Sequence, residues 1–488
     1  MPPDLPAALS LAAFALQLAG ELTGESPFSA GMAGAGGAAS PSVLDAGRNP
    51  ALLPSLFDAG GARLLDLNLR ALGSDGEVTS RFGGDAIPEA DTALGPWLAY
   101  AARAGEDVFW SIALLPTAGG SSSSVRTTAL DIVTVNLDGS GGPAPHDVRF
   151  ESELLQIALE PSLGWRAGRS WSFGVGLSIR DTDLALASAS QIELSELDGA
   201  LDPGLTGIFG DISWGELILQ LGEDRGVETF QAEFAAEADS TLPQVFLKLG
   251  ALWEADERTQ VGFWYRPPST PTDIEGRVLV DLSADLGTFV NQVGEVIGET
   301  LLENPTSDYD FRIGDVRLPQ QAGVAVTHDL GSGRRLHATA LWTDWSRSFS
   351  DWTAELTNPS NPEFLEYLGG DGSTEVDLDL AWRDSVAVSL GCEQDLGARW
   401  TVRGGAAWAR DPVGGTVLAG LAPFNQWHVG AGASRWGRGA HAVDWHLGAV
   451  VALPETLQTG SNELLEDLSF DKIRQWNWSL AVGCVIRW

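Results

Sequence analysis

The chain has 488 residues, and its 66 Asp and Glu residues against 29 Lys and Arg residues give a formal net charge of −37. We expect no binding to nucleic acid, because contact with a phosphate backbone requires clustered cations that this acidic chain lacks. The 58 Gly, 19 Trp and 4 Tyr residues favour strands with a small-residue inner face and with Trp as the aromatic residue at membrane interfaces.

The first predicted element is an apolar run from Ala7 to Gly20, which has the length of a signal-peptide core. Ser10 and Gln17 interrupt this run, and no Lys or Arg precedes Arg48, so the usual positively charged leader is missing. We expect residues 1–24 to be a secretion signal, with a structural helix as the alternative. The sequence contains no run of about eighteen consecutive apolar residues, so a membrane-spanning helix is not expected.

A segment rich in small residues follows, from Ser29 to Pro54, and it contains Gly-Met-Ala-Gly-Ala-Gly at residues 31–36. The glycine spacing at residues 34–39 superficially resembles a dinucleotide-binding turn, but no strand precedes it and no βαβ unit follows. Small residues allow a chain to pack inside a narrow space. We therefore predict a compact segment at residues 25–58 and a body of strands at residues 59–488.

Beyond Gly60, apolar and polar residues alternate in about fourteen segments, an even number, as single-chain bacterial barrels require. Short turns rich in Gly or Asp join every second pair, and the other connections are long and acidic, as expected for periplasmic and extracellular ends. The predicted fold is therefore an all-β, transmembrane antiparallel β-barrel. The predicted strands are Ala62–Arg70, Trp97–Arg103, Val108–Leu115, Leu154–Trp165, Trp171–Arg180, Val245–Glu254, Thr259–Arg266, Gln321–Asp329, Leu336–Trp345, Asp379–Gln394, Trp400–Arg410, Trp427–Trp436, His441–Leu453 and Ile473–Trp488.

Two long connections contain apolar residues at helical spacing, one between residues 183 and 240 and the other between residues 270 and 312. Loops of this length in a compact fold are usually functional. We predict that the two amphipathic helices form an apolar ligand groove; the alternative is that they cap the barrel. The groove candidates are Trp214, Leu217, Ile218 and Leu221 in the first connection and Leu286, Phe289, Val290, Val293 and Ile297 in the second.

The final strand carries the clearest membrane pattern, because its apolar row is unbroken and the positions between hold small or polar residues. A half-buried strand of a soluble sandwich is the alternative. We predict that Trp476, Trp478 and Trp488 act as a membrane-insertion signal. The apolar row consists of Trp476, Trp478, Leu480, Val482, Cys484, Ile486 and Trp488.

Several motifs together resemble the FadL/TodX family, the outer-membrane long-chain fatty acid and hydrocarbon transporters. The first are the glycine-rich run at residues 31–36 and Asn49-Pro50-Ala51 just before the first strand. One departure is Ala422-Pro-Phe-Asn-Gln-Trp427, where the family tends to have a Pro-Asp-Arg type segment. The motifs of the second half are Val316-Arg-Leu-Pro-Gln-Gln-Ala-Gly323, Leu341-Trp-Thr-Asp-Trp-Ser-Arg-Ser-Phe349, Trp382-Arg-Asp-Ser385 and Arg403-Gly-Gly-Ala-Ala-Trp408.

The resemblance implies a transporter of the bacterial outer membrane whose N-terminal segment is a hatch that plugs the lumen, with Asn49, Pro50 and Ala51 as hatch residues. It implies passive uptake of a hydrophobic compound. A long-chain fatty acid is the expected ligand, and an aromatic or aliphatic hydrocarbon is the alternative. It also implies a gap in the wall at the third strand, near residues 108–116. The expected surroundings are outer-membrane lipid and lipopolysaccharide, and the expected state is a monomer.

The sequence offers no local support for catalysis. No HExxH pair is present, and His441 and His446 point to opposite faces of a strand, so we expect no metal. No GxSxG nucleophile elbow is present either, and we expect no catalytic residues and no cofactor. An outer-membrane lipid hydrolase, with Ser and His on neighbouring strands at the lipid face, and a purely structural or adhesive barrel remain as alternatives.

Overall fold

The computed structural model describes residues 24–58, 60–79, 85–86, 89–90, 93–130, 144–194, 197–201, 206–207, 210–222, 229–298, 302–349, 351–364, 372–379, 382–412, 425–439, 441–458 and 472–488. Within these ranges, no helix has both the length and the apolar character needed to cross a membrane. The predicted signal, residues 1–24, falls outside the described part of the chain except for Gly24.

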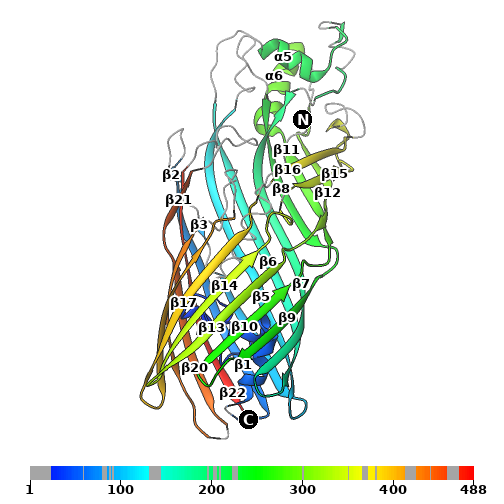
Figure 1. Cartoon of the computed structure of the whole chain (residues 1–488). Helices are drawn as coiled ribbons and strands as arrows, with labels where there is room; N and C mark the ends of the chain where they lie inside the picture. The colour runs from blue at the N-terminus through cyan, green and yellow to red at the C-terminus, as the bar shows by residue number, and fades with distance from the viewer. Residues whose placement is uncertain are drawn as a thin grey trace.

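Fourteen antiparallel strands form a closed barrel (Figure 1). The first and last strands close it, in register from Leu64 opposite Arg487 to Thr79 opposite Lys472. The predicted barrel is confirmed, and each predicted strand overlaps one strand of the ring. The ring consists of β1 (Arg63–Thr79), β4 (Ala93–Arg103), β5 (Val108–Leu130), β6 (Ala144–Ala167), β7 (Trp171–Glu193), β9 (Gln244–Glu254), β10 (Thr259–Arg266), β13 (Gln321–Gly331), β14 (Arg334–Thr343), β17 (Ser385–Leu396), β18 (Trp400–Ala409), β19 (Trp427–Arg435), β20 (Val443–Ala452) and β22 (Lys472–Arg487).

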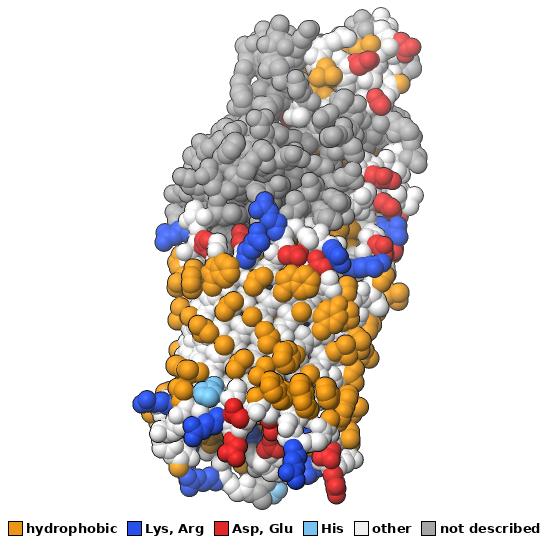
Figure 2. Space-filling model, viewed as in Figure 1, with side chains coloured by type: hydrophobic (Ala, Val, Ile, Leu, Met, Phe, Trp, Pro, Cys, Tyr) orange, Lys and Arg blue, Asp and Glu red, His pale blue; other side chains and the backbone are white. Residues whose placement is uncertain are grey.

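On the face of the barrel that Figure 2 shows, hydrophobic side chains form a belt, with charged residues above and below it. The belt follows from strand alternation: on β22, Leu480 and Val482 are 46% and 44% exposed, whereas Ser479 beside them is buried. Trp478 is half-buried because its ring covers Gly73 of β1. The apolar row therefore faces outward from one closed sheet, as in a lipid-facing barrel, and the sandwich alternative is wrong.

The last residue completes the junction between the first and last strands. The carbonyl oxygen of Trp488 accepts hydrogen bonds from the backbone N–H groups of Ala62, at 2.8 Å, and Arg63, at 3.1 Å. Trp488 itself is half-buried, and Trp476, near the other end of the apolar row, is 37% exposed. The two residues lie near opposite ends of the last strand, and their role in insertion stays a prediction.

A second group of strands continues the sheet above the barrel from the upper part of β7 (Figure 1). These strands pair in the order β8, β11, β12, β15 and β16. The two long connections therefore each contain strands as well as a helix, and the helical spacing did not predict those strands. One predicted ring strand is also too long at its start, because Asp379 ends β16 and the ring strand begins at Ser385. The added strands are β8 (Thr229–Ser240), β11 (Thr272–Asp281), β12 (Thr306–Val316), β15 (Asp351–Thr357) and β16 (Thr374–Asp379).

Charged residues pair across the outer face of this added sheet. Arg312 on β12 stands directly opposite Glu275 on β11 and Glu355 on β15, with nitrogen to oxygen distances of 3.5 and 3.0 Å. The backbone N–H of Asp315 and the Arg312 guanidinium hold the pKa of Asp273 below its ordinary value. Opposite charges that face each other on neighbouring strands favour this strand pairing, and the surrounding water weakens the effect.

Helices occur where the apolar stripes predicted them, at the end of the molecule far from the C-terminus (Figure 1). The first is α5 (Trp214–Gly222), and the second is α6 (Thr288–Ile297), which follows one π-helical turn, η4 (Ser283–Gly287). Gly298 ends α6 with a φ of 82°, the left-handed conformation that suits glycine. The remaining elements are α2 (Pro27–Ala30), α3 (Asp45–Arg48), η1 (Pro50–Phe57), β2 (Asp85–Ala86), β3 (Glu89–Ala90) and β21 (Glu455–Gln458).

Candidate functional site

The segment from residue 25 to 58, called the hatch below, folds inside the lower half of the barrel (Figure 1). Its own fold depends on Asp45, whose carboxylate accepts hydrogen bonds from three serine hydroxyls. Ser26 and Ser29 donate at 2.6 Å, each to a different oxygen, and Ser40 donates as well. Because Asp45 is buried, these bonds replace the water that its charge has lost and hold both halves of the hatch together.

A second buried carboxylate, Asp66 of β1, ties the hatch to the barrel wall. It accepts hydrogen bonds from the Ser42 hydroxyl and, at 2.8 Å, from the backbone N–H of Val43. The Asn68 side chain donates to its other oxygen at 2.6 Å. These polar contacts fix the position of the hatch along the barrel axis. They join the hatch to β1, the strand that directly follows it in the chain.

Glycines of the wall allow the backbone of the hatch to lie against the strands. A Cβ on Gly174 would lie 2.3 Å from the carbonyl carbon of Pro50, and one on Gly250 would lie 2.2 Å from Asn49 Oδ1. Neither distance can occur in a protein, so these strand positions accept only glycine while the hatch is in place. We call Gly164, Gly174, Gly250 and Gly262 the first glycine patch.

The opposite wall has a comparable set of glycines beneath α2. A Cβ on Gly448 would lie 2.2 Å from the carbonyl oxygen of Pro27, and one on Gly430 would lie 2.5 Å from the backbone nitrogen of Ala33. Nearby, the Arg403 guanidinium of β18 lies 4.3 Å from the ring centroid of Phe28 in the hatch. The hatch thus packs against two opposite sides of the barrel wall. We call Gly391, Gly405, Gly430, Gly432 and Gly448 the second glycine patch.

The predicted hatch residues Asn49, Pro50 and Ala51 lie at the first glycine patch, and all three are buried. The Asn49 side chain accepts from the backbone N–H of Ala51 and donates to the carbonyl oxygen of Gly37, both at 3.2 Å. Asn49 is therefore the N-cap of η1, and Pro50 takes the first helical position, where its missing N–H costs nothing.

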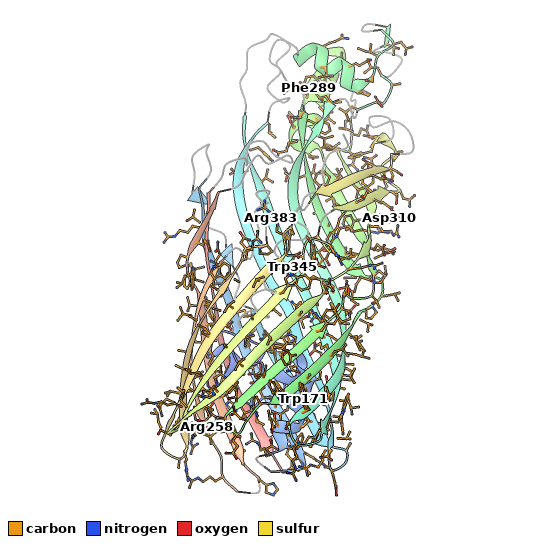
Figure 3. All side chains as sticks on the ribbon, in the orientation of Figure 1. Trp171, Arg258, Phe289, Asp310, Trp345 and Arg383 are labelled. Atoms are coloured by element: carbon orange, nitrogen blue, oxygen red, sulfur yellow. The ribbon has the colours of Figure 1, made fainter. Side chains whose placement is uncertain are left out.

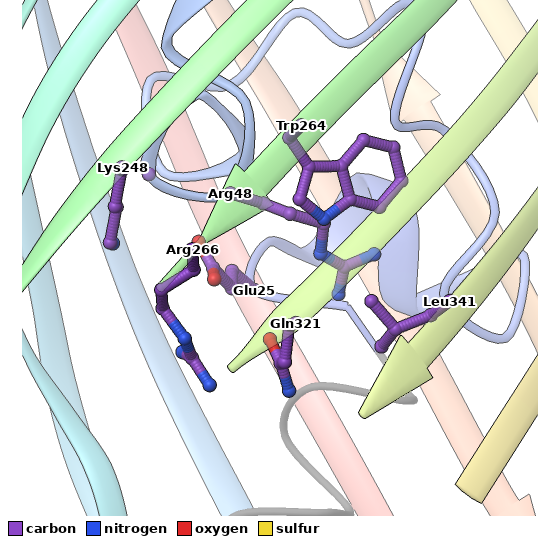
Figure 4. A pocket seen from close by; sticks show the side chains of 8 residues that line it. Glu25, Arg48, Lys248, Trp264, Arg266, Gln321 and Leu341 are labelled. Atoms are coloured by element: carbon purple, nitrogen blue, oxygen red, sulfur yellow. The ribbon is translucent and has the colours of Figure 1, made fainter. Parts of the chain in front are cut away.

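A small pocket lies between the hatch and the wall (Figure 4). Glu25 and Arg48 reach it from the hatch, and Lys248 of β9 and Arg266 of β10 reach it from the wall. Three basic residues and one acidic residue thus meet next to apolar surface. The lining consists of Glu25, Gly47, Arg48, Lys248, Trp264, Arg266, Gln321 and Leu341.

The wall side of this pocket is a buried network of charges. Lys248 pairs with Glu160 of β6 at 2.5 Å, and both side chains are at most 6% exposed. Arg180 and Arg266 both lie over the ring of Phe246, at 4.8 and 4.7 Å from its centroid. Charged groups in a lumen are held this closely when aromatic rings and opposite charges replace their hydration.

Sequence reasoning missed this pocket because its lining comes from segments that are far apart in the chain. A signal was nevertheless present in the strand pattern. Lys248 and Arg266 occupy inward positions of predicted strands, between outward apolar residues such as Leu247, Leu249 and Tyr265. A basic residue at an inward position of a membrane strand marks a polar lumen and a candidate site.

The groove candidates whose side chains are described belong to one contiguous apolar cluster. Figure 3 places Phe289 near the outer end of the molecule, far beyond Trp345 at the upper rim of the barrel. The side chains of Leu221, Val293 and Ile297 are outside the described set, although their helices are described. The groove itself therefore stays a prediction. The described candidates are each at most 3% exposed: Trp214, Leu217, Ile218, Leu286, Phe289 and Val290.

The seam between β4 and β5 is incomplete in the part of it that the structure describes. Ladder pairing runs from Arg103 opposite Phe109 up to Leu98 opposite Leu114, and pairing with β5 resumes farther up on β3, at Ala90 opposite Ser122. Above this point Pro96 lies on β4 and Pro116 lies on β5, next to a bulge. Proline has no N–H to donate, and it occurs in sheets at edges and bulges. β5 is the third strand of the ring, where the resemblance implied a gap.

A serine and a histidine do meet on neighbouring strands, but the arrangement is not that of a hydrolase. Ser434 of β19 and His446 of β20 are directly opposite and 2.6 Å apart, and both are buried from lipid. Arg403 also donates to the Ser434 hydroxyl, and His446 Nε2 has no hydrogen-bond partner among the described residues. No acid orients this imidazole as a general base requires. The described residues also contain no group of three or more His, Cys, Asp or Glu that could hold a metal.

Residues 143–416, more than half of the chain, match the family model described as outer membrane protein transport protein (OMPP1/FadL/TodX). No curated protein matches the chain in sequence.

Solved structures of similar fold cover almost the whole chain. The toluene transporter TodX of P. putida is 15% identical, with a TM-score of 0.65 and coverage of 96% of this chain and 99% of that one. The toluene transporter TbuX of Ralstonia pickettii is 17% identical, with a TM-score of 0.60 over 95% and 98%. A Pseudomonas aeruginosa FadL homologue is 16% identical, with a TM-score of 0.63 over 100% of both chains. At these identities, the likeness concerns the fold.

Replacement of Gly174 by alanine is expected to displace the hatch, because the added Cβ would overlap Pro50. Such overpacking costs about 1–3 kcal/mol, and the hatch relieves it by leaving its seat. The measurement is ion conductance of the purified protein in planar bilayers, which should rise several-fold. The control is Gly404→Ala, where the new Cβ would meet no atom closer than 3.6 Å. Equal conductance of the two variants would contradict the role of the first glycine patch.

Proposed function

The chain belongs to the outer membrane transport protein family OMPP1/FadL/TodX, and on that premise we propose that the compound it carries is a long-chain fatty acid. The coarser function follows from the family: the protein is an outer-membrane transporter of hydrophobic compounds and not an enzyme. The lipid hydrolase alternative is therefore wrong. The fatty acid is proposed from the charge of the lumen pocket.

The pocket beside the hatch supports a ligand with a negatively charged head. Arg48, Lys248 and Arg266 meet Glu25 there, and the one described partner of Lys248 outside the lining is Glu160. A carboxylate would make charge-assisted hydrogen bonds with this group of cations, while Trp264 and Leu341 offer apolar surface to the first part of a hydrocarbon chain. A toluene-like compound is the second candidate, since two similar folds are toluene transporters, but it has no charged group that would bind these cations.

We also propose that the helices α5 and α6 capture the ligand first. Their described apolar residues belong to an apolar cluster that continues into the barrel and the hatch, and burial of ligand hydrocarbon against it is worth about 25 cal/mol for each Å² removed from water. The ligand then moves down its gradient to the pocket. The concentration gradient of the ligand is the only driving force in this proposal.

The exit that we propose is the incomplete seam between β4 and β5. Strands without ladder bonds separate at a lower cost than paired strands, because fewer backbone groups lose partners. A ligand that leaves here enters the outer membrane sideways.

The closed ring has no open edge for pairing with another chain, so we propose a monomer surrounded by outer-membrane lipid and lipopolysaccharide.

The pocket is tested by Arg266→Gln, which should weaken the binding of oleate about tenfold, because one charge-assisted contact of about 1.5 kcal/mol is lost. Binding of toluene should not change, since it has no charge to pair. The matched control is Arg403→Gln, because Arg403 is also a buried arginine of the barrel wall but lies on β18, away from the pocket. Equilibrium binding to the purified barrel is the measurement. Equal effects on oleate and toluene would contradict a carboxylate site.

The capture site is tested by Phe289→Asp, which places a charge in the apolar cluster. Binding of oleate should fall at least tenfold, because a buried charge without a partner costs several kcal/mol and disrupts the cluster. Asn291→Asp adds the same charge to an exposed position of the same helix and should bind oleate normally. Both variants should retain a folded, heat-modifiable barrel. Normal binding by Phe289→Asp would remove the groove from the pathway.

The exit is tested by a disulfide between cysteines at positions 95 and 116. A Cβ on Gly95 would lie 3.8 Å from that of Pro116, which is the usual separation in a disulfide. In a chain whose native Cys392 and Cys484 are replaced by alanine, oxidation should reduce oleate uptake into liposomes at least tenfold, and reduction should restore it. Gly95→Cys alone is the control. Unchanged uptake by the oxidised protein would place the exit elsewhere.

A further inference from the structure

Three exposed arginines gather at the upper rim of the barrel, where β14 ends, β17 begins and β18 ends. They are Arg347, Arg383 and Arg410. The backbone N–H of Arg410 donates to the carbonyl oxygen of Val386 at 2.9 Å, and that of Arg383 donates to the carbonyl oxygen of Pro412 at 2.8 Å. Arg383 and Arg410 therefore lie on adjacent segments of the rim.

Arg347 comes from the next segment along the rim. The hydroxyl of Ser346, the residue before it, donates to Asp384 Oδ1 at 2.8 Å, and Asp384 directly follows Arg383. Neighbouring strands of a sheet lie about 5 Å apart, and an extended arginine side chain is longer than this spacing. Because β14, β17 and β18 are neighbours in the ring, the three guanidinium groups can reach one small charged group between them.

The protein itself leaves much of this positive charge without a partner. Among the residues that the structure describes, the guanidinium groups of Arg383 and Arg410 make no hydrogen bond or ion pair. Arg347 has one weak contact, 3.5 Å from Asp344, and its side chain is 79% exposed. Asp344 and Asp384 already accept hydrogen bonds from other side chains of the rim, at 2.5 and 2.8 Å. The arginines are therefore available to a negatively charged ligand.

Outward-facing tryptophans lie next to these arginines on the barrel wall. Trp342 of β14 and Trp408 of β18 point outward, because the residues on both sides of each are buried. Arg410 follows two positions after Trp408 and continues its outward row. Tryptophans of a membrane barrel lie at the level of the lipid head groups. Charged side chains border the upper edge of the hydrophobic belt in Figure 2, and Figure 3 shows Arg383 at this end of the barrel.

We propose that Arg347, Arg383 and Arg410 bind a phosphate group of a lipid in the outer leaflet of the membrane. A guanidinium presents parallel N–H groups that match phosphate oxygens, and one phosphate has enough oxygens for more than one arginine. The acyl chains of the same lipid lie against the apolar outward row of β17, where Val386 and Val388 are 41% and 40% exposed. A free phosphate ion gains only the charged contact, so the site prefers the lipid.

The site lies across the ring from the proposed exit. In the ring of fourteen strands, β14, β17 and β18 are the ninth to the eleventh, whereas β4 and β5 are the second and third. A lipid bound here holds the barrel at a fixed height in the membrane and leaves the exit uncovered. The inference depends on the outer-membrane location of the barrel and not on the compound that it transports.

The test is equilibrium binding of lipid A to the purified, delipidated barrel in detergent micelles. Lipid A with its phosphate groups should bind at least tenfold more tightly than the same lipid after removal of its phosphates. The double variant Arg383→Gln and Arg410→Gln should lose this preference and bind both lipids with the same low affinity. Inorganic phosphate at the concentration of the lipid should not displace it. Binding of oleate should be the same in the double variant and the parent.

The matched control is the double variant Arg169→Gln and Arg438→Gln. Both arginines are exposed in short turns at the opposite end of the barrel, so this variant has the same net charge as the first. It should keep the full preference for phosphorylated lipid A. Equal losses in the two double variants would show attraction by charge alone and would overturn the proposal. Equal affinity of the parent for the two lipids, a comparison that needs no variant, would overturn it as well, and so would displacement of the lipid by inorganic phosphate.

Discussion

The fold depends on one constraint: the lumen is too wide for the side chains of the wall to fill. A backbone segment of the same chain closes it instead. Eight-stranded barrels are filled by their own side chains, whereas a ring of fourteen strands leaves open space. Here the hatch occupies that space, and its backbone approaches the wall so closely that Gly174 and Gly448 leave no room for a Cβ. Asp45 and Asp66 then supply the hydrogen bonds that keep the hatch folded and in place. The close approach of the hatch backbone to the wall explains part of the high glycine content of the chain.

The barrel could be predicted from the sequence because lipid imposes one rule on every strand. Each outward residue must be apolar, whereas inward residues are small, polar or, as at Phe246 and Trp264, aromatic, so the period of two is clearest where the inward row is small or polar, as in the last strand. The added strands above the barrel lack that constraint. On β11, buried Ile274, Val278 and Val280 do alternate with residues that are more exposed. A longer apolar stripe at helical spacing follows in the same connection, and that stripe predicts a helix but not the strand before it.

The hatch residues Asn49, Pro50 and Ala51 follow from the family resemblance and not from a local pattern, and their role in the hatch stays a prediction; the structure adds that Asn49 caps η1 and that Pro50 takes its first helical position. The pocket could not be predicted from the sequence, because its charges meet only after β9, β10 and the hatch are assembled. Lys248 and Glu160, which pair at 2.5 Å, come from strands that are not even neighbours in the ring. An inward charge in the strand pattern signals a polar lumen, but which charges meet across that lumen is a property of the closed ring alone.

The same contacts favour a sideways path over a downward one. A downward path requires the hatch to leave two glycine patches and to break its bonds with Asp66, all of which lie in or beside its folded backbone. At its lower end, the Arg166 side chain also holds the carbonyl oxygen of Pro54 at 2.9 Å and pairs with Asp58. Between β4 and β5, in contrast, no ladder bonds join the stretch above Leu98 and Leu114 until β3 pairs with β5 at Ala90 and Ser122. Because each broken buried hydrogen bond exposes a polar group at a cost of about 1–3 kcal/mol, this comparison supports the unpaired stretch as the proposed exit.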